Sequence, residues 1–451
     1  MTELPHLLVI HGNMAPLGGA ERDLLVALPA HLRRWSVSLA TLNAPQLVHD
    51  RCRDLGVDLV TPESPWDQPV GGLDEVTAAA GRSARRAWRS LRTSAMGTTL
   101  DVAIERADAA LIVIGPGTLE ILEHLPLDLP LHAFLVEMHR GVHDDVLHRR
   151  FDGTPKRPMW FTKIALSYLR RWDRSWHRRL WNRPMTAISS NTPTSIRRLA
   201  AAHRWPVLEH WIAGEHGPRD ASHRPSGVGV LWHAVDPSQW PEVATDEERL
   251  AWDEFKQRPE GAYLLTIGRA CYMKGSLEAL RIARASGLQL VHVGGGETDA
   301  LKQHADGMGV ALNVMPRITD LEIAGLMRHA RAVLAIARGE GFGLTPLEAM
   351  MVGTPALAVD EAGFTHTITD GWNGRRLPWP VDDEDLSRWV EAIVACEDPE
   401  LRTRWAKAGR SRIEERWTPE HHAEAVARSL AAMGASVSTT DAPFLPGLDP
   451  A

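Results

Sequence analysis

The feature that most constrains this chain is a strict alternation of short apolar runs and helical patterns between residues 263 and 359. Five apolar runs are typical of buried strands: Tyr263–Ile267, Leu288–Val293, Leu312–Met315, Ala332–Ala337 and Ala356–Val359. Helical patterns occupy the intervals between them, at 276–285, 298–304, 320–329 and 346–352. Such alternation predicts a parallel sheet with helices on both faces.

The first half of the chain begins in a similar way. Its predicted strands are His6–His11, Val37–Leu42, Ala109–Gly115, His132–Met138, Met185–Ser189 and Val228–Trp232, with a helix from Ala20 onward. The polar stretch 241–261 then reads as a connection. We therefore predict an α/β protein of two doubly wound, Rossmann-like domains, 1–240 and 241–418, and a disordered tail at 435–451.

Composition narrows the class of protein. The chain has 451 residues and a formal net charge of −7, which argues against a general nucleic-acid binder. Its three cysteines are far apart and have no metal-ligand spacing, which indicates a reducing compartment. No signal peptide is expected from the N-terminal residues, and no apolar run approaches the ~18 residues of a membrane span. We expect a cytoplasmic protein.

The stretch Arg338–Pro355, RGEGFGLTPLEAMMVGTP, combines a glycine-rich turn with the start of a helix. Backbone N–H groups and a positive helix end at such a turn favour an anion, most often a phosphate. Glu340 lies between glycines and has no obvious structural purpose. Glu348 fits two interpretations: a ligand contact, or the third residue of a capping box in which Thr345 is the N-cap and Pro346 begins the helix.

Basic and glycine-rich turns follow other predicted strands. Arg269 and Lys274 come after the strand at 263–267, where they would either neutralise a diphosphate or form an exposed basic turn. Gly18 and Gly19 begin the first helix, which fits a close phosphate or sugar contact but also a simple tight turn. His139 follows the strand at 132–138, on the ligand side of a parallel sheet.

A basic, tryptophan-containing helix is predicted at 158–182. Its apolar residues follow helical spacing, and much of the remainder is basic: Lys163, Arg170, Arg171, Arg174 and Arg178. One interpretation is peripheral contact with an anionic membrane or an anionic acceptor. The other, which we favour, is a surface helix that packs its apolar stripe on its own domain.

Together these motifs resemble a known enzyme family. The stretches that carry the likeness are GGAERDLLVAL near the start, EMH at 137–139, VDPSQW at 235–240, GRACYMKG at 268–275, EGFGLTPLEAMMVGTP at 340–355 and DGWNG at 370–374. They are similar to glycosyltransferase family 4, the retaining, nucleotide-sugar-dependent enzymes of GT-B fold. The resemblance implies two Rossmann-like domains that face a central cleft, with helix 419–432 crossing back to the first domain.

The resemblance also implies roles for single residues. Catalytic roles fall to Glu340, Arg269, Lys274 and His139. Donor binding falls to Gly18, Gly19, Gly268, Gly343, Leu344, Thr345 and Glu348. In this scheme Arg269 and Lys274 bind the diphosphate, Glu340 the sugar hydroxyls and Glu348 the ribose. No cofactor is expected, and no metal ion either, because no Asp-x-Asp motif lies beside a candidate donor site; the cation pair and the helix end would stabilise the leaving group.

The expected reaction moves a hexosyl group from a nucleotide-diphospho-sugar to a hydroxyl acceptor by front-face attack, with retention. The acceptor can be anionic or lipid-linked. Three departures from the family pattern affect acceptor-side and sugar-side details: His233-Ala234, Ala337 and His366. An epimerase, a phosphorylase or a non-catalytic partner subunit on the same fold stays open as an alternative, since fold does not fix function.

Overall fold

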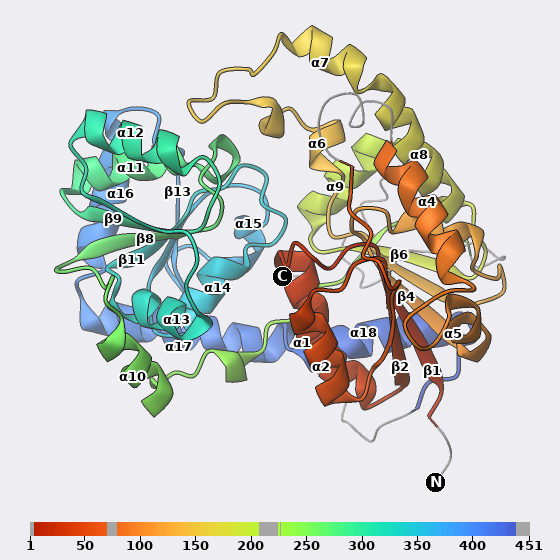
Figure 1. Cartoon of the computed structure of the whole chain (residues 1–451). Helices are drawn as coiled ribbons and strands as arrows, with labels where there is room; N and C mark the ends of the chain where they lie inside the picture. The colour runs from red at the N-terminus through yellow and green to blue at the C-terminus, as the bar shows by residue number, and fades with distance from the viewer. Residues whose placement is uncertain (1–3, 70–78, 207–223, 226, 439–451) are drawn as a thin grey trace. The chain divides into compact units, whose positions relative to one another are not determined.

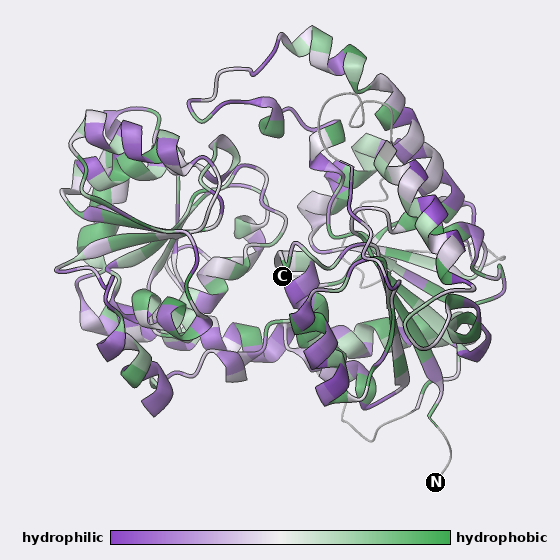
Figure 2. Ribbon diagram, viewed as in Figure 1, coloured by the Kyte–Doolittle hydropathy of each residue, from purple (hydrophilic) through white to green (hydrophobic). Residues whose placement is uncertain are grey.

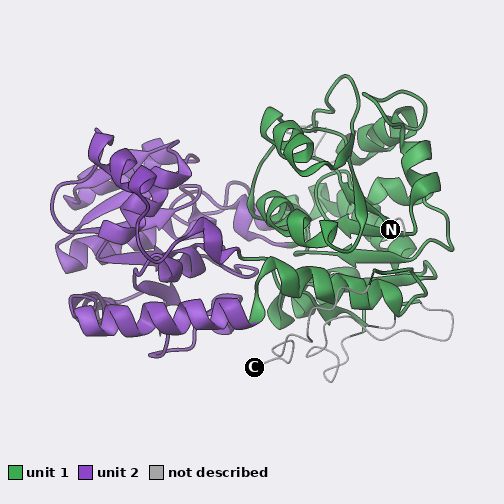
Figure 3. Cartoon of the chain, turned by 90° about the horizontal axis from the view of Figure 1, so that it is seen from below, with its two compact units in different colours: residues 1–143, 160–235, 416–451 green, residues 144–159, 236–415 purple. Residues whose placement is uncertain are grey.

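The computed structural model describes residues 4–69, 79–206, 224–225 and 227–438. Its chain divides into two compact units (Figure 3). Unit 1 comprises residues 1–143, 160–235 and 416–451, and unit 2 comprises 144–159 and 236–415. The predicted disordered tail falls largely on 439–451, which lie outside the described residues.

Unit 1 contains a parallel sheet in the order β3-β2-β1-β4-β5-β6-β7 (Figure 1). Its strands are β1 His6–His11, β2 Ser36–Thr41, β3 Asp58–Val60, β4 Ala109–Val113, β5 Leu131–Phe134, β6 Thr186–Ser190 and β7 Gly229–Val230. The helices are α1 Gly19–Leu32, α2 Gln46–Leu55, α4 Ala79–Leu91, α5 Leu100–Arg106, α6 Arg140–His143, α7 Met159–Ala165, α8 Ser167–Trp181, α9 Pro193–His203 and α18 Pro419–Ala431, with the 3-10 turn η1 Leu119–Glu123.

Alternate residues of β1 explain why this sheet is covered on both faces. Leu7 and Val9 join the apolar cluster under α1, α2 and α18, whereas Leu8 and Ile10 join the cluster under α4, α8 and α9. A strand that is buried on both sides reads as a continuous apolar run, because successive side chains point to opposite faces. Figure 2 shows the strands of both units mostly in the hydrophobic colour.

Unit 2 contains a second parallel sheet, in the order β10-β9-β8-β11-β12-β13. Its strands are β8 Tyr263–Ile267, β9 Gln289–Val293, β10 Leu312–Met315, β11 Ala332–Ala335, β12 Ala356–Val359 and β13 Arg375–Leu377. The helices are α10 Asp246–Glu254, α11 Ser276–Ser286, α12 Thr298–Met308, α13 Asp320–His329, α14 Leu344–Met351, α15 Phe364–Thr367, α16 Asp383–Ala395 and α17 Pro399–Arg416, with 3-10 turns η2 Val146–His148, η4 Pro237–Gln239 and η5 Tyr272–Lys274. Helices α11, α12 and α16 lie on one side of this sheet, and α10, α13 and α17 on the other (Figure 1).

The last helix, α18, is part of unit 1. It packs on α1, and the two arginines that follow α1 form ion pairs with it: Arg33 with Glu420 at 2.9 Å and Arg34 with Glu424 at 2.5 Å. The Val235 N–H donates to the Trp417 carbonyl at 2.6 Å. This bond joins the segment that leaves unit 1 after Val235 to the segment that returns to it at residue 416.

Residues 144–159 lie in the middle of the predicted first domain, yet their contacts place them in unit 2. The Arg149 guanidinium lies 5.6 Å from the centroid of the Tyr272 ring, and the Phe151 ring lies 5.0 Å from that of His304. Gly153 lies so close to Tyr272 that a Cβ would be 2.7 Å from the ring. These contacts join residues far apart in sequence, which strand and helix periodicity cannot reveal.

The basic helix predicted at 158–182 is two helices, so that prediction is wrong in part. The backbone of the buried Leu166 departs from helical values, with ψ near 0°, and separates α7 from α8. Three arginines of α8 are used internally: Arg170 donates to the Val142 carbonyl, Arg174 to that of Ala202, and Arg179 to Glu123. In α7, by contrast, three large apolar side chains are exposed.

Candidate functional site

The candidate site in unit 2 lies where the order of its strands reverses. From β8 the chain builds outward through β9 to β10, and from β11 it builds outward in the other direction through β12 to β13. The neighbouring strands β8 and β11 therefore flank the topological switch point, and loops that follow them leave at the same edge. Ligands of open parallel sheets bind in the crevice outside this edge.

Lys274 and Glu340 meet at this point. Lys274 follows β8 and Glu340 follows β11, and their Nζ and Oε2 atoms are 2.6 Å apart. The Lys274 and Glu340 side chains are 32% and 23% exposed, respectively, so the pair reaches solvent. Because a partly exposed ion pair contributes only ~0–1 kcal/mol, a ligand with stronger charges can replace it at little cost.

Arg269 lies on the same loop as Lys274 and is exposed. The described residues supply no ion-pair partner for its guanidinium. Gly268, which precedes it, has φ +132°, and the Gly268 carbonyl lies against Gly294, where a Cβ would be 2.1 Å away. The glycines at 294 and 296 thus allow the loop after β9 to approach the loop after β8.

The glycine-rich turn ends in α14, but its cap differs from the predicted one. Gly343, with φ +92°, is the N-cap, and the helix begins at Leu344 without a side-chain cap. The predicted capping box with Thr345 as N-cap is therefore wrong. Glycine adopts the left-handed backbone that this cap requires, and no side-chain oxygen covers the first turn. Glu348 lies farther along the helix and is half-buried.

Two further residues hold the turn, and the sequence patterns did not reveal them. The Arg338 guanidinium lies between the rings of Tyr272 and Trp379, at 3.9 and 4.2 Å from their centroids, and donates to the Tyr272 carbonyl. Glu361 accepts the Gly339 N–H at 2.7 Å and the Trp379 indole N–H at 2.7 Å. The sequence signal that could have identified Glu361 was the position of a glutamate shortly after β12.

The remaining predicted site residues lie in unit 1. Gly18 is the N-cap of α1 and Gly19 its first residue. His139 is exposed, and the His139 carbonyl accepts the N–H groups of Val142 and His143 at the start of α6. The structure therefore brings Lys274 and Glu340 into contact within unit 2, while Gly18, Gly19 and His139 belong to the other unit.

The switch point of unit 1 lies between β1 and β4 and contains buried polar groups. The Thr118 hydroxyl accepts the Gly12 N–H at 2.8 Å and the Gly115 N–H at 3.0 Å. His11 Nε2 lies 3.5 Å from Glu21 Oε1, but burial lowers the pKa of His11 to about 4 and raises that of Glu21. At neutral pH the imidazole is therefore uncharged.

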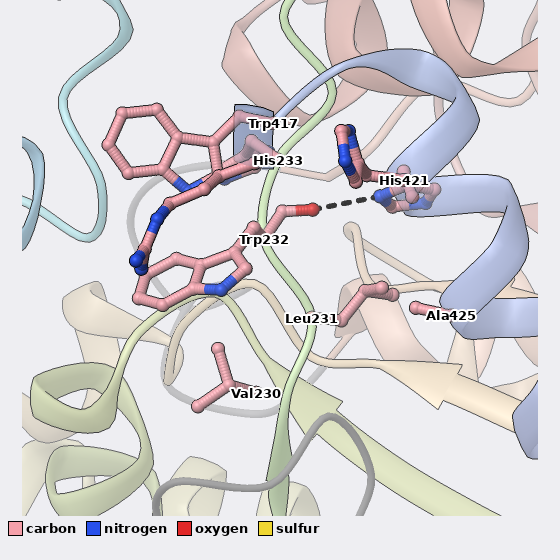
Figure 4. A pocket seen from close by; sticks show the side chains of 9 residues that line it. Val230, Leu231, Trp232, His233, Trp417, His421 and Ala425 are labelled. Carbon is pink, nitrogen blue, oxygen red and sulfur yellow. Dashed lines mark hydrogen bonds between the residues drawn. The ribbon is translucent and has the colours of Figure 1, made fainter. Parts of the chain in front are cut away.

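The departure His233-Ala234 has a local structural explanation. Asp23 of α1 lies 3.0 Å from His233 Nδ1, and its other oxygen accepts the Ala234 N–H at 2.6 Å. This buried contact joins α1 to the segment that follows β7. Next to it, a pocket in unit 1 lies between that segment and α18, where the Trp232 carbonyl accepts a hydrogen bond from His422 (Figure 4). None of the predicted donor-binding residues lines this pocket.

Comparison with known proteins shows which family the candidate site region resembles. Residues 249–412 match the model of the family described as glycosyl transferases group 1. This region of the chain resembles the group 1 glycosyl transferases. The matched region contains Arg269, Lys274, Glu340 and Glu348, together with the switch point of the unit 2 sheet.

Two curated relatives match parts of the chain. A phosphatidyl-myo-inositol mannosyltransferase of Mycolicibacterium smegmatis is 30% identical over 161 residues, which cover 34% of this chain and 41% of that protein. The protein of the same name from Mycobacterium leprae is 26% identical over 286 residues, covering 59% and 67%. The first match thus spans about two fifths of its relative's length.

A solved structure supports the fold of the whole chain. The crystal structure of Anabaena HepE in complex with UDP and glucose superposes with a TM-score of 0.61 at 15% identity, covering 95% of this chain and all of that one. Together with the two parallel-sheet units, this likeness shows the GT-B fold that the sequence predicts. Within the described residues, no helix is both long enough and apolar enough to span a membrane.

Proposed function

We propose that the chain is a glycosyltransferase that moves a hexosyl group from a nucleotide-diphospho-sugar to a hydroxyl acceptor. The single observation that carries the proposal is the contact of Lys274 with Glu340 at the switch point of unit 2. A cation and a carboxylate at one ligand-binding edge match a donor that has anionic phosphates and sugar hydroxyls.

The proposed roles follow from charge. Breaking the bond between the sugar and the diphosphate develops negative charge on the leaving group. Arg269, Lys274 and the N-terminus of α14 would stabilise that charge, without a divalent ion at the diphosphate. Glu340 would release Lys274 and accept hydrogen bonds from the hydroxyls of the sugar, while Glu348 would bind the ribose. Retention by front-face attack and a sugar contact from His139 complete the proposal.

The donor is tested with purified full-length protein and a panel of UDP-, GDP-, ADP- and dTDP-sugars. The panel includes mannosyl and glucosyl donors, because the curated relatives are named mannosyltransferases and HepE was crystallised with UDP and glucose. A bound donor at ~100 times its dissociation constant should stabilise the fold by ~2.7 kcal/mol. A thermal unfolding midpoint that no nucleotide sugar shifts would contradict the proposal.

Mass spectrometry then separates transfer from the alternatives. A transferase consumes the donor and forms a glycosylated product only with an acceptor. An epimerase would form a new nucleotide sugar without one, and a phosphorylase would require inorganic phosphate. A partner subunit would bind the donor and leave it intact.

We also propose that α7 contacts a membrane surface on the cytoplasmic side, where a lipid-linked acceptor would be reached. Trp160, Phe161 and Ile164 are 67%, 45% and 64% exposed, and Lys163 lies among them. Exposed aromatic residues beside a cation are typical of interfacial helices. Co-sedimentation with anionic vesicles should fall when Trp160 and Ile164 are changed to Ser, and should persist for Leu250→Ser, an exposed leucine of α10 in unit 2. Equal binding by both variants, or none by the wild type, rules out this contact.

A further inference from the structure

Three side chains from separate helices of unit 1 converge in a cluster that the proposed function does not use. His143 ends α6, Asp173 lies in α8, and His203 ends α9. One potential metal-ligand atom from each lies within 4.8 Å of the others. His143 Nε2 is 2.8 Å from Asp173 Oδ2, and His203 Nδ1 is 3.8 Å from the same oxygen.

His203 is the unusual member of the cluster. Its side chain is 1% exposed, and neither ring nitrogen has a hydrogen-bond partner among the described residues. A buried imidazole without such a partner is costly, since its polar atoms have lost water and gained nothing. Both ring nitrogens of His203 are therefore open to a ligand that the described residues do not supply.

The surroundings hold the three side chains in place. The His177 ring stacks on that of His203 at a centroid distance of 3.6 Å, and His177 Nδ1 hydrogen-bonds the Asp173 carbonyl at 3.0 Å. The Trp205 ring packs against His203 from another direction, at 5.2 Å. Metal ligands in proteins are commonly oriented by such an outer layer of stacked and hydrogen-bonded groups.

We propose that His143, Asp173 and His203 bind a divalent transition-metal ion of the zinc type. Two imidazoles and a carboxylate suit such an ion, and water would complete a tetrahedral set. Around zinc, with bonds of ~2.0–2.2 Å, ligand atoms lie ~3.3 Å apart. The two separations from Asp173 Oδ2, 2.8 and 3.8 Å, bracket that value, and the atoms of the two histidines lie within 4.8 Å of each other.

The ion would act as a structural link within unit 1. It would tie the end of α6 to α8 and α9, next to the point at which the chain leaves unit 1 for residues 144–159. His139, whose carbonyl begins α6, would be held in position through the same link. The site depends on the three ligands alone and stands whether or not the proposed glycosyl transfer is correct.

The test begins with untagged full-length protein that has been stripped with a chelator. Isothermal titration with Zn²⁺ should give about one ion per chain, and Co²⁺ should give visible d–d absorption bands. The thermal unfolding midpoint should rise on loading. Mg²⁺ should not compete, because it prefers oxygen ligands. If the wild type takes up no zinc, or if Mg²⁺ competes equally, the proposal is wrong.

Ligand variants locate the ion. Asp173→Asn and His203→Gln should weaken zinc binding by about 100-fold or more, and His177→Ala by about 10- to 100-fold through loss of orientation. His49→Gln, in α2 of the same unit, should bind zinc as the wild type does. Zinc uptake by folded Asp173→Asn that equals the wild type would place the ion elsewhere and overturn the assignment. If the variants fail to fold, the stoichiometry and the cobalt spectrum of the wild type decide whether a zinc-type ion is bound.

Discussion

The two units share one strand order, apart from a seventh strand in unit 1, but they present different chemistry where that order reverses. In unit 1 the loops after β1 and β4 are bound together by the Thr118 hydroxyl, which accepts the N–H groups of Gly12 and Gly115. In unit 2 the loops after β8 and β11 present Arg269, Lys274 and Glu340 to solvent. The topology supplies a location for a ligand, and side chains decide whether that location is charged.

This difference assigns separate tasks to equivalent edges. The unit 2 edge has charged side chains that a ligand can bind, because its ion pair is partly exposed. The unit 1 edge has a neutral buried histidine and glycines without side chains, so it contributes shape and backbone groups. Changes at the first edge should therefore alter activity, and changes at the second should alter stability.

The largest expected effect is on catalysis at the unit 2 edge. Lys274→Ala and Glu340→Ala should each lower kcat/KM for glycosyl transfer by ~10²–10³-fold, because each removes a preorganised contact to the donor. Stability should change by no more than ~1 kcal/mol. Steady-state kinetics and thermal unfolding measure both. Lys302→Ala, on exposed α12, is the matched control. Transfer within about twofold of the wild type would remove these residues from the site.

Gly12→Ala should damage the unit 1 edge through stability instead. A Cβ at Gly12 would lie 2.1 Å from the Pro116 carbonyl oxygen and 2.7 Å from the Thr118 backbone nitrogen, and neither is a flexible side-chain end. We expect a loss of ~2–3 kcal/mol in urea unfolding. Gly307→Ala in α12 meets no atom within 4 Å and should be stabilising by ~0.4–1 kcal/mol. Equal effects of the two substitutions would contradict the crowding at Gly12.

Acid should weaken unit 1 through a buried histidine between α1 and α18. Burial, with His422 and Arg34 nearby, lowers the pKa of His31 to about 3. A histidine whose folded pKa lies below its unfolded value of ~6.5 stabilises the fold above pH ~6.5, and this contribution is lost as the pH falls toward the folded value.

The corresponding experiment compares unfolding free energies at pH 7 and pH 4.5. His31→Leu should reduce the acid-induced loss by ~2.7 kcal/mol, since the two pH units between 6.5 and 4.5 each correspond to ~1.36 kcal/mol. In unit 2, burial lowers the pKa of His292 to about 4, which makes His292→Leu the matched variant. An unchanged acid dependence in His31→Leu would show that this imidazole is not buried as described.

The smallest expected effect concerns the support of the glycine-rich turn. Glu361→Gln keeps one acceptor oxygen and cannot satisfy both the Gly339 N–H and the Trp379 indole. We expect kcat/KM to fall by ~10-fold, because one lost hydrogen bond of ~1.4 kcal/mol corresponds to that factor. Most of the change should be in kcat, since Glu340 would be misplaced. Glu384→Gln on exposed α16 is the control. A change in stability alone would leave Glu361 a purely structural residue.

The sequence alone was sufficient for most of the fold and for one contact of the candidate site. The strands predicted at 263–267, 312–315 and 356–359 coincide with β8, β10 and β12, because buried parallel strands are uninterrupted apolar runs between helices. The approach of Lys274 to Glu340 also follows from sequence order. Both residues lie in loops that follow strands, and the carboxyl ends of parallel strands share one edge.

Tertiary structure decided what depends on contacts between distant residues. It placed residues 144–159 in unit 2, and it made Gly343 the cap of α14, where a local motif had indicated Thr345. It also assembled His143, Asp173 and His203, which have no metal-ligand spacing along the chain. Periodicity reports which face of an element is buried, but only the packing of helices against one another determines which side chains meet there.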